Sequence, residues 1–248
     1  MKSRIVFAAA TALLFSVPVR ASEIKVLSTQ AIEGAYRELV PTFEGVTGHK
    51  VTTVFTGTLD VQKRIAAGEV YDLIIMAGSD LDKFIATGKV VPGSRADLAK
   101  SGVGAAVRAG AIKPDIRTTD GLKKALLSAR SIGYSTGPSG LIVTSMFQRL
   151  GIADQIKDKL KQTPTGVFVG TLLANGEADI GFQQVSELLS FAGIDYLGPL
   201  PAAVQQYTTF SGGIQSGAKE PDAARAWLRF ITAPAAAPAY RKRGMETF

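Results

Sequence analysis

Short apolar runs of strand length alternate with helical patterns in the first part of the chain. The run at 73–76 is continuously apolar and predicts a strand buried on both faces, while the run at 51–55 is short and β-branched. Apolar positions at helical spacing predict a helix over 31–44, which Pro41 should kink or shorten. The other elements expected here are a strand that begins at Ile24 and helices over 59–67 and 79–86.

A second alternating series runs from Gly102 to about Gly198. It predicts, in order, helix 120–130, strand 131–135, helix 139–150, helix 153–160, helix 167–175 and strand 179–183. A strand over 207–214 and helices over 222–232 and 235–243 close the chain. This alternation predicts an α/β fold of two units, with a mostly parallel sheet and helices on both faces.

The N-terminus has the pattern of a secretory leader. Lys2 and Arg4 precede an apolar run over 5–17, and small residues stand at the minus-3 and minus-1 positions of a cleavage site after Ala21. We expect residues 1–21 to be removed on export to the periplasm, without membrane insertion, because no apolar run is long enough to span a bilayer. Loss of Lys2, Arg4 and Arg20 lowers the formal charge from +7 to +4. That mild excess argues against a nucleic-acid-binding surface.

The chain has no Cys and one His. An exported form therefore has no disulfide and depends on burial of its core, for which this length suffices. The usual ligands of zinc and copper are also missing, so we expect no metal site and no cofactor. A small electroneutral or anionic ligand is the more consistent expectation.

The segment 133–137 matches G-x-S-x-G, the nucleophile elbow of α/β-hydrolases, between a predicted strand and a predicted helix. Those enzymes place the His of their triad after the Ser, whereas His49, the one imidazole, precedes Ser135. We interpret 133–137 as a Gly-rich turn and His49 as a solvated surface residue. No P-loop or dinucleotide-binding motif occurs.

Small hydroxyl- or Gly-rich turns recur where a predicted strand ends and a predicted helix begins. They are 28–30, 56–58, 137–140 and 165–166. A turn of this kind presents free backbone N–H groups at the positive end of a helix dipole, although Ser, Thr and Gly also serve simply as helix caps. Ligands of open α/β sheets bind beyond the carboxyl ends of strands, so two units with two such turns each would enclose an anion.

Several blocks of the sequence carry a family resemblance. They are Phe43-Glu44-x-x-Thr47-Gly48, Ile65-x-x-Gly68-Glu69-x-x-Asp72-Leu73, Gly176-Glu177-Ala178-Asp179-Ile180-Gly181 and Ala224-x-x-Trp227-Leu228-x-Phe230-Ile231 followed by Arg243-Gly244-Met245. With the order of elements, they make the chain similar to the periplasmic molybdate-binding proteins and their relatives in the type II periplasmic binding-protein superfamily. The resemblance implies two doubly wound α/β lobes joined by a hinge, lobe 1 from 22–104 and 208–248 and lobe 2 from 105–207. It also implies an inner-membrane ABC permease as partner.

The resemblance also implies a site made of hydroxyls and backbone amides, with a Tyr from the second lobe. By position, these roles fall here on Ala31, Thr58, Ser139, Gly166 and Gln184. The loss of a hydroxyl at Ala31 and of the Tyr at Gln184 favours a larger oxygen-rich anion, such as a di- or tricarboxylate, over molybdate or tungstate. The complete set of expected ligand-binding residues is Ser28, Thr29, Gln30, Ala31, Gly57, Thr58, Ser139, Gly166, Val167 and Gln184, with Gln183 as a possible replacement donor.

A catalytic alternative stays open, because aconitate isomerase resembles the same molybdate-binding relatives. Its reaction moves a proton from one end of an allylic system to the other and needs a base that titrates near neutral pH. The candidates in the sequence are Asp60, Glu33 and Lys63, with Arg64 to pair with a carboxylate. A narrow cavity of amides and hydroxyls would favour a tetrahedral oxyanion, and a wider one with Arg or Lys would favour a polycarboxylate.

Overall fold

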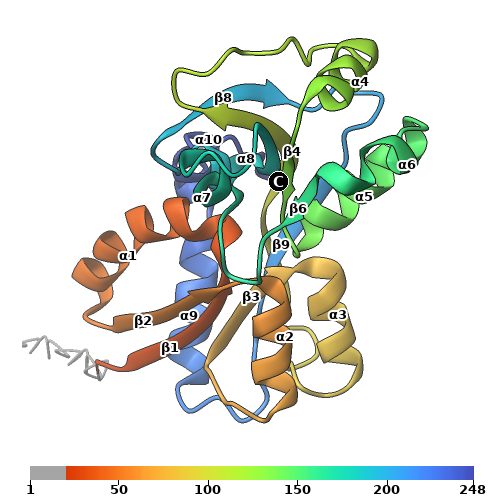
Figure 1. Ribbon diagram of the computed structural model, residues 1–248. Coiled ribbons are helices and arrows are strands. Elements are labelled where there is room, and N and C mark those ends of the chain that lie inside the picture. The colour runs from red at the N-terminus through yellow and green to blue at the C-terminus, as the bar shows by residue number, and fades with distance from the viewer. Residues whose placement is uncertain (1–20) are drawn as a thin grey trace, which may run out of the picture.

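The first lobe is built on three parallel strands. The computed structural model describes residues 21–248, so the expected leader up to Arg20 lies outside the described residues. In lobe 1, β1 (Glu23–Thr29) lies between β2 (Lys50–Thr56) and β3 (Leu73–Ala77) and is parallel to both. The first three helices of this lobe, in the lower part of Figure 1, are α1 (Glu33–Thr47), α2 (Thr58–Ala66) and α3 (Gly78–Ala86).

Lobe 2, at the top of Figure 1, repeats the arrangement on a smaller scale. Its central strand β5 (Ile132–Tyr134) is parallel to β6 (Leu160–Gln162) and to β7 (Ile180–Gln184). The helices are α4 (Thr119–Ser128), α5 (Pro138–Arg149), α6 (Ala153–Ile156), α7 (Val169–Ala174) and α8 (Val185–Leu188). The predicted two-lobed α/β architecture is thus present, while the lobe boundaries at 104/105 and 207/208 stay a prediction.

Two long strands pass between the lobes. β4 (Ala96–Arg108) is antiparallel to β9 (Tyr207–Ile214) over 96–102 and then to β7 and β8 (Ile194–Pro199) over 103–108. The sheet runs in the order β2-β1-β3-β9-β4-β7-β5-β6, with β8 beside β4. The expectation of a mostly parallel sheet is wrong at its centre, because one strand leads out of lobe 1 and the other leads back, and the two must run in opposite directions.

Gln205 hydrogen-bonds the backbone of β4 where that strand passes from one lobe to the other. Gln205 Oε1 accepts a hydrogen bond from the Val103 N–H at 2.9 Å, and its Nε2 donates to the Val103 carbonyl at 2.8 Å. Val103 is the residue at which β4 exchanges β9 for β7 as its partner. The side chain therefore satisfies backbone groups at the point where the ladder changes partners.

Each lobe has its own apolar core. In lobe 1, Trp227 of α9 (Pro221–Thr232) has its ring centroid 5.0 Å from that of Tyr36 and 4.8 Å from that of Phe43. The short helix α10 (Ala237–Arg241) adds Tyr240 to the same cluster. The core of lobe 2 is mainly aliphatic and includes Val143, Met146, Phe147, Ile156 and Phe182. Separate cores let each lobe hold its shape independently of the other.

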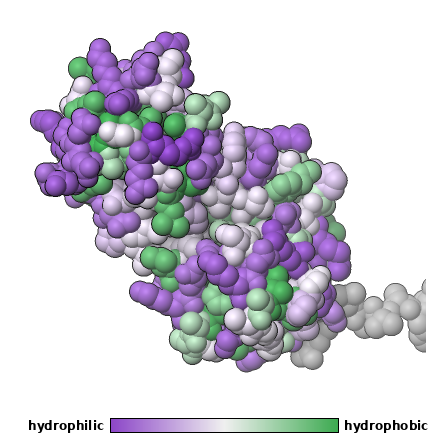
Figure 2. Space-filling view, turned by 90° about the vertical axis from the view of Figure 1, so that its right-hand side faces the viewer, coloured by the Kyte–Doolittle hydropathy of each residue, from purple (hydrophilic) through white to green (hydrophobic). Residues whose placement is uncertain are grey.

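The outer surface is mostly hydrophilic. Figure 2 shows the lobes as two masses joined at a waist, with apolar residues in small, separated patches. No helix within residues 21–248 is long and apolar enough to cross a membrane.

The prediction that Pro41 shortens the first helix is wrong, and a kink at Pro41 stays a prediction. A 3₁₀ turn, η1 (Gln30–Ile32), leads into α1, which continues past Pro41 to Thr47 and ends at Gly48 with φ 74°. Pro41 and Arg37 both lie on the exposed face, so water can bond the Arg37 carbonyl that the proline leaves without a donor. Burial of Tyr36 and Phe43 on the other face holds the helix together.

Other elements differ from the predictions in lobe 2 and at the crossing. The helix expected over 153–160 is α6 followed by a 3₁₀ turn over 157–159, and strand β6 begins at Leu160. Neither β4 nor β8 was predicted. β4 is rich in Ala and Gly, which have low strand propensity, so its length comes from pairing on both sides.

His49 is not a solvated surface residue. Its side chain is 7% exposed, stacks on Phe43 with ring centroids 6.0 Å apart, and accepts a hydrogen bond from the Ser22 N–H at Nδ1. The Gly and Lys on either side of it suggested exposure, but the aromatic core of lobe 1 extends as far as this turn. His49 is a structural residue at the start of β2.

Two acidic residues of the family blocks, Asp72 and Asp179, accept hydrogen bonds from backbone N–H groups. Asp72, just before β3, accepts hydrogen bonds from the N–H groups of Lys25, Lys219 and Glu220 at 2.8, 2.7 and 2.9 Å. Asp179, just before β7, accepts from the Arg130 N–H at 2.8 Å. Both lie at the amino ends of their strands, away from the ends where a ligand is expected.

Replacing Tyr36 with Phe should destabilise the protein. The Tyr36 hydroxyl accepts from Trp227 Nε1 at 2.9 Å and bonds Thr53 Oγ1 at 2.7 Å, so its loss leaves a buried indole N–H without a partner. We expect a loss of about 1–3 kcal/mol in the free energy of unfolding, measured by urea denaturation. Tyr207→Phe, at a side chain 53% exposed, is the control and should change it by less than about 0.5 kcal/mol. Equal midpoints for the two variants would contradict this role.

Candidate functional site

The two lobes meet around a narrow cavity of about 30 Å³ at the carboxyl ends of the strands. That volume holds about one or two water molecules. The lining consists of hydroxyls, amides and small residues from both lobes, joined by one carboxyl: Thr29, Gln30, Ala31, Gly57, Thr58, Ser135, Thr136, Gly137, Pro138, Ser139, Thr163, Pro164, Gly166, Val167, Gln183, Gln184, Glu187 and Phe210. A roomier hollow of about 830 Å³ lies against α4 in lobe 2, but it shares none of these residues and lies away from the turns that end the strands.

Lobe 1 contributes the ends of β1 and β2. Thr29 Oγ1 accepts from the Ala31 N–H at 3.4 Å and caps the turn η1. Gly57 is the N-cap of α2, and no side chain caps that helix, so its first N–H groups have no partner within the helix. Thr58, 5% exposed, adds a hydroxyl at the same place.

Lobe 2 contributes the matching helix start. Gly137 is the N-cap of α5, again without a side-chain cap, and Pro138 follows it. Ser135 and Ser139 bond each other at 2.9 Å beside it. A Cβ built on Gly137 would lie 3.9 Å from Thr58 Oγ1, so the N-termini of α2 and α5 face each other across the cavity. Two such ends place partial positive charge on both sides of the space.

A buried hydroxyl at this site has no hydrogen-bond partner. Thr163 is 1% exposed and lines the cavity, yet its Oγ1 bonds nothing within the described part of the chain. A buried hydroxyl without a partner costs free energy. A ligand in the cavity would supply the missing partner.

The lobes touch directly beside the cavity. Gln30 Nε2 of lobe 1 donates to the Gly166 carbonyl of lobe 2 at 3.1 Å. A Cβ on Gly57 would lie 2.5 Å from the Gly166 N and would overlap Thr165 Oγ1. Glycine at 57 therefore allows an approach of the lobes that a side chain would prevent.

Gln184, at the position where the family has Tyr, is bound to the crossing strands. Its amide lies 3.0 Å from Thr208 Oγ1 of β9. With the amide oxygen assigned toward Thr208, the nitrogen donates to the carbonyls of Ser101 and Gly102 on β4. Gln184 lines the cavity, but its polar atoms are committed to the backbone that joins the lobes.

The one ionisable side chain that lines the cavity, within residues 21–248, is Glu187. Burial raises the pKa of its carboxyl to about 8, hydrogen bonds from the Gln184 backbone and the Gln183 side chain oppose that rise, and the charge of Glu33 adds to it. At pH 7 the carboxyl is therefore mostly protonated and neutral. An anion beside it meets a hydrogen-bond donor instead of a like charge.

The structure brings most of the predicted binding residues together. All of the expected ligand-binding residues line the cavity except Ser28, which is fully buried and donates to the Thr29 carbonyl. Their contact with a ligand stays a prediction. Thr163 and Glu187 were not predicted, because neither stands in a Gly-rich turn and burial is not visible in a single sequence.

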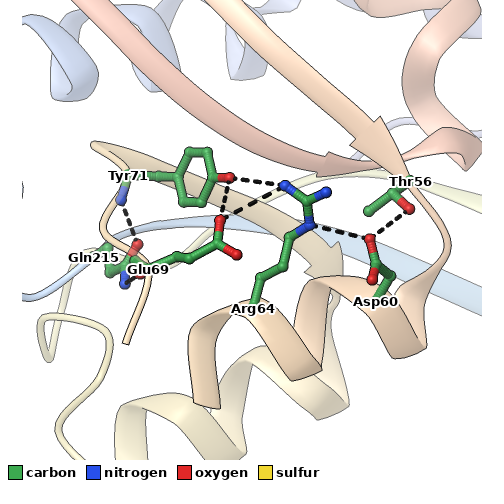
Figure 3. Close-up of polar contacts among 6 residues, drawn as sticks. All are labelled: Thr56, Asp60, Arg64, Glu69, Tyr71 and Gln215. Atoms are coloured by element: carbon green, nitrogen blue, oxygen red, sulfur yellow. Dashed lines mark hydrogen bonds and ion pairs between the residues drawn. The ribbon is translucent and has the colours of Figure 1, made fainter. Parts of the chain in front are cut away.

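The catalytic candidates Asp60, Lys63 and Arg64 do not line the cavity. Figure 3 shows Asp60 between Thr56 and Arg64, which donate to its carboxylate at 2.9 and 3.1 Å, and Arg64 reaching on to Tyr71 at 3.2 Å. These groups satisfy one another on the face of α2. Among residues 21–248, no group of three or more His, Cys, Asp or Glu side chains could hold a metal ion.

Comparison with known proteins identifies the family. Residues 24–246 match the family described as bacterial extracellular solute-binding proteins. The chain belongs to that family. It is 37% identical over 244 residues to aconitate isomerase from a Pseudomonas species, across 96% of this chain and 92% of that protein. It is 29% identical over 190 residues to the molybdate-binding protein ModA of Azotobacter vinelandii, across 75% of this chain and 73% of that protein.

Solved structures of two other binding proteins share the fold. The periplasmic molybdate-binding protein of Azotobacter vinelandii has a TM-score of 0.77 at 22% identity, over 90% of this chain and 98% of that one. The sulfate-binding protein SubI of Mycobacterium tuberculosis has a TM-score of 0.72 at 17% identity, over 90% of this chain and 86% of that one. The predicted resemblance and the type II binding-protein fold class are confirmed.

Thr163→Val should weaken anion binding without loss of stability. The substitution keeps the shape of the side chain and removes a hydroxyl that has no partner in the protein. We expect a ten- to hundredfold loss of affinity, about 1.5–3 kcal/mol, for the tightest ligand among molybdate, sulfate, citrate and trans-aconitate, measured by calorimetry. Thr87→Val, at an exposed hydroxyl that bonds its own helix, is the control. Unchanged affinity in Thr163→Val would place the ligand elsewhere.

Gly57→Ala should hold the lobes apart. The backbone at 57 has φ −72°, so alanine is tolerated locally, and the clash is with Thr165 and Gly166 of the other lobe. We expect at least a tenfold loss of affinity, about 1.4 kcal/mol, and a larger radius of gyration by small-angle scattering. Gly45→Ala, where a Cβ meets nothing within 4 Å, is the matched control. Equal affinity and equal compactness of the two variants would rule out this contact as the limit on closure.

Proposed function

We propose that this solute-binding protein captures a small oxygen-rich anion between its lobes. The observation that carries the proposal is the unpartnered buried hydroxyl of Thr163 in a cavity that the uncapped N-termini of α2 and α5 face from opposite lobes. Backbone N–H groups at helix starts are strong, oriented donors for anions. Proteins described as binders of molybdate and of sulfate have the same fold.

The absence of a positive side chain from the lining supports a neutral-donor mode of binding. Within the described residues no Lys or Arg lines the cavity, so binding depends on hydroxyls, amides and helix dipoles. The volume of about 30 Å³ favours a compact oxyanion in the arrangement seen here. A polycarboxylate would need the lobes to stand further apart.

A second candidate is the isomerisation of aconitate. It is supported by the 37% identity to aconitate isomerase across nearly the full length of both chains, which exceeds the 29% identity to ModA over a shorter part. The loss of the family Tyr at Gln184 and of the Ser at Ala31 points the same way, because smaller side chains leave room for a larger anion. The lobes of this fold can separate and close again around such a ligand.

In the binding role, the partner is an inner-membrane ABC permease that receives the anion from the two lobes. The family description as extracellular supports action outside the cytoplasm. Export to the periplasm follows from the leader pattern of residues 1–21.

A ligand panel distinguishes the two candidates. The purified chain from Ser22 onward is titrated with molybdate, tungstate, sulfate, citrate and trans-aconitate, and each is followed by thermal unfolding. A true ligand at about 100 times its Kd should stabilise the protein by about 2.7 kcal/mol, a rise in Tm of roughly 5–10 °C. Formation of cis-aconitate beyond one equivalent per protein establishes catalysis. No shift with any anion would overturn the anion-binding proposal.

A further inference from the structure

Glu187 is an unusual group in this site. It is the third residue of α8, 9% exposed, on the wall of a cavity that otherwise offers donors to an anion. In its charged form it opposes the binding of another carboxylate, and in its protonated form it can donate a hydrogen bond to one, so a change in its protonation directly affects an anion in the cavity. α8 packs against η1 of the other lobe, which places Glu187 where the lobes meet.

Hydrogen bonding from two neighbours lowers the pKa of the carboxyl against the larger effect of burial. The neighbours are the side chain of Gln183 and the backbone of Gln184, the N-cap of α8, which an acidic side chain at the third helical position can cap. Gln183 is itself held, since its Oε1 accepts from the Val169 N–H at 2.8 Å. A rigid support of this kind keeps a reacting group at a constant distance from a bound substrate.

Few ionisable side chains lie on the elements that pack against Glu187. β7 and η1, which pack against α8, carry no ionisable side chain. The ionisable residues on the other neighbouring segments are Asp97, Lys100 and Arg108 on β4, Asp195 and Tyr196 on β8, Glu33 at the start of α1, and Arg243. Of these, Glu33 contributes to the raised pKa of Glu187, and burial is the larger cause. The carboxyl thus exchanges its proton near neutral pH, as a general base should.

We propose that Glu187 is the catalytic residue that takes a proton from one end of the allylic system of aconitate and returns it at the other end. This inference rests on the second candidate function. The Glu187 carboxylate accepts a proton from the methylene carbon, and the electron pair of the broken C–H bond enters an allylic anion shared with the adjacent carboxylates. The carboxylic acid then protonates the former alkene carbon, the double bond moves by one position, and the Glu187 carboxylate is restored. No oxidant, reductant or cofactor takes part.

The rest of the lining suits the intermediate. Negative charge accumulates on the substrate carboxylates after the proton is removed, and the free N–H groups at the starts of α2 and α5 stabilise such charge. The other candidate bases are excluded by position, since Asp60 bonds Thr56 and Arg64 outside the cavity. Glu33, the neighbouring carboxylate, bonds Arg37 at 2.7 Å and does not line the cavity.

The test compares Glu187→Gln with Glu187→Asp and with the control Glu177→Gln, whose exposed carboxylate bonds Asn175 at 3.0 Å. Gln keeps the capping role of the side chain and removes its ionisation. We expect Glu187→Gln to lower kcat for trans-aconitate by about 10²- to 10⁴-fold while calorimetric affinity for trans-aconitate changes less than about tenfold. Glu187→Asp should recover part of kcat, and Glu177→Gln should match the unaltered protein.

The pH profile gives a second readout. In the unaltered protein and in Glu177→Gln, kcat/KM should rise about tenfold per pH unit up to a plateau near pH 8, because the base must be ionised, and this rise should be absent from Glu187→Gln. Turnover by Glu187→Gln within about threefold of the unaltered protein overturns the inference, as does a flat profile of the unaltered protein. Binding of trans-aconitate without turnover by the unaltered protein overturns the isomerase candidate as well but leaves anion binding intact. If Glu187→Gln fails to fold, Glu187→Asp and the pH profile decide the matter.

Discussion

A site that binds an anion without a cationic side chain depends on how close two helix N-termini can come. Each N-terminus carries about half a positive charge at most, and water weakens its effect quickly with distance. The structure meets this constraint with Gly57, which lets the loop at Thr165 and Gly166 approach α2. The two-lobed fold, the crossing strands and the small residues of the turns all serve that approach.

Burial then decides which polar groups remain available. Three of the six hydroxyls that line the site are already bonded within the protein: Thr29 to the Ala31 amide, and Ser135 to Ser139. The free donors are therefore fewer than the lining suggests, and Thr163 stands out among them. The same dry surroundings change the chemistry of Glu187, whose proton is retained at pH values where an exposed glutamate has lost it.

Much of this arrangement is readable in the sequence, and the reasons for the rest are physical. Apolar periodicity predicts the positions of the strands and helices of lobe 1 well, because each of these elements buries a continuous face. It fails for β4, where Ala and Gly give little signal and pairing with β7, β8 and β9 supplies the stability. The strand-end turns identify the site because their Gly and hydroxyl residues have a local meaning. Glu187 has no such local signature: its importance comes from what folds around it, which a single sequence does not display.

Gln184 contacts both the ligand cavity and the two strands that join the lobes, regions that a hinged protein usually keeps separate. Its backbone and side chain border the cavity, while its amide bonds the strands that carry one lobe relative to the other. One side chain is therefore in contact with both the ligand cavity and the strands that join the lobes. Substitutions at this position in related chains would therefore alter both ligand selectivity and the motion of the lobes. New ligand preferences in this fold can arise from a change in the strands that join the lobes as readily as from a change in the groups that touch the ligand.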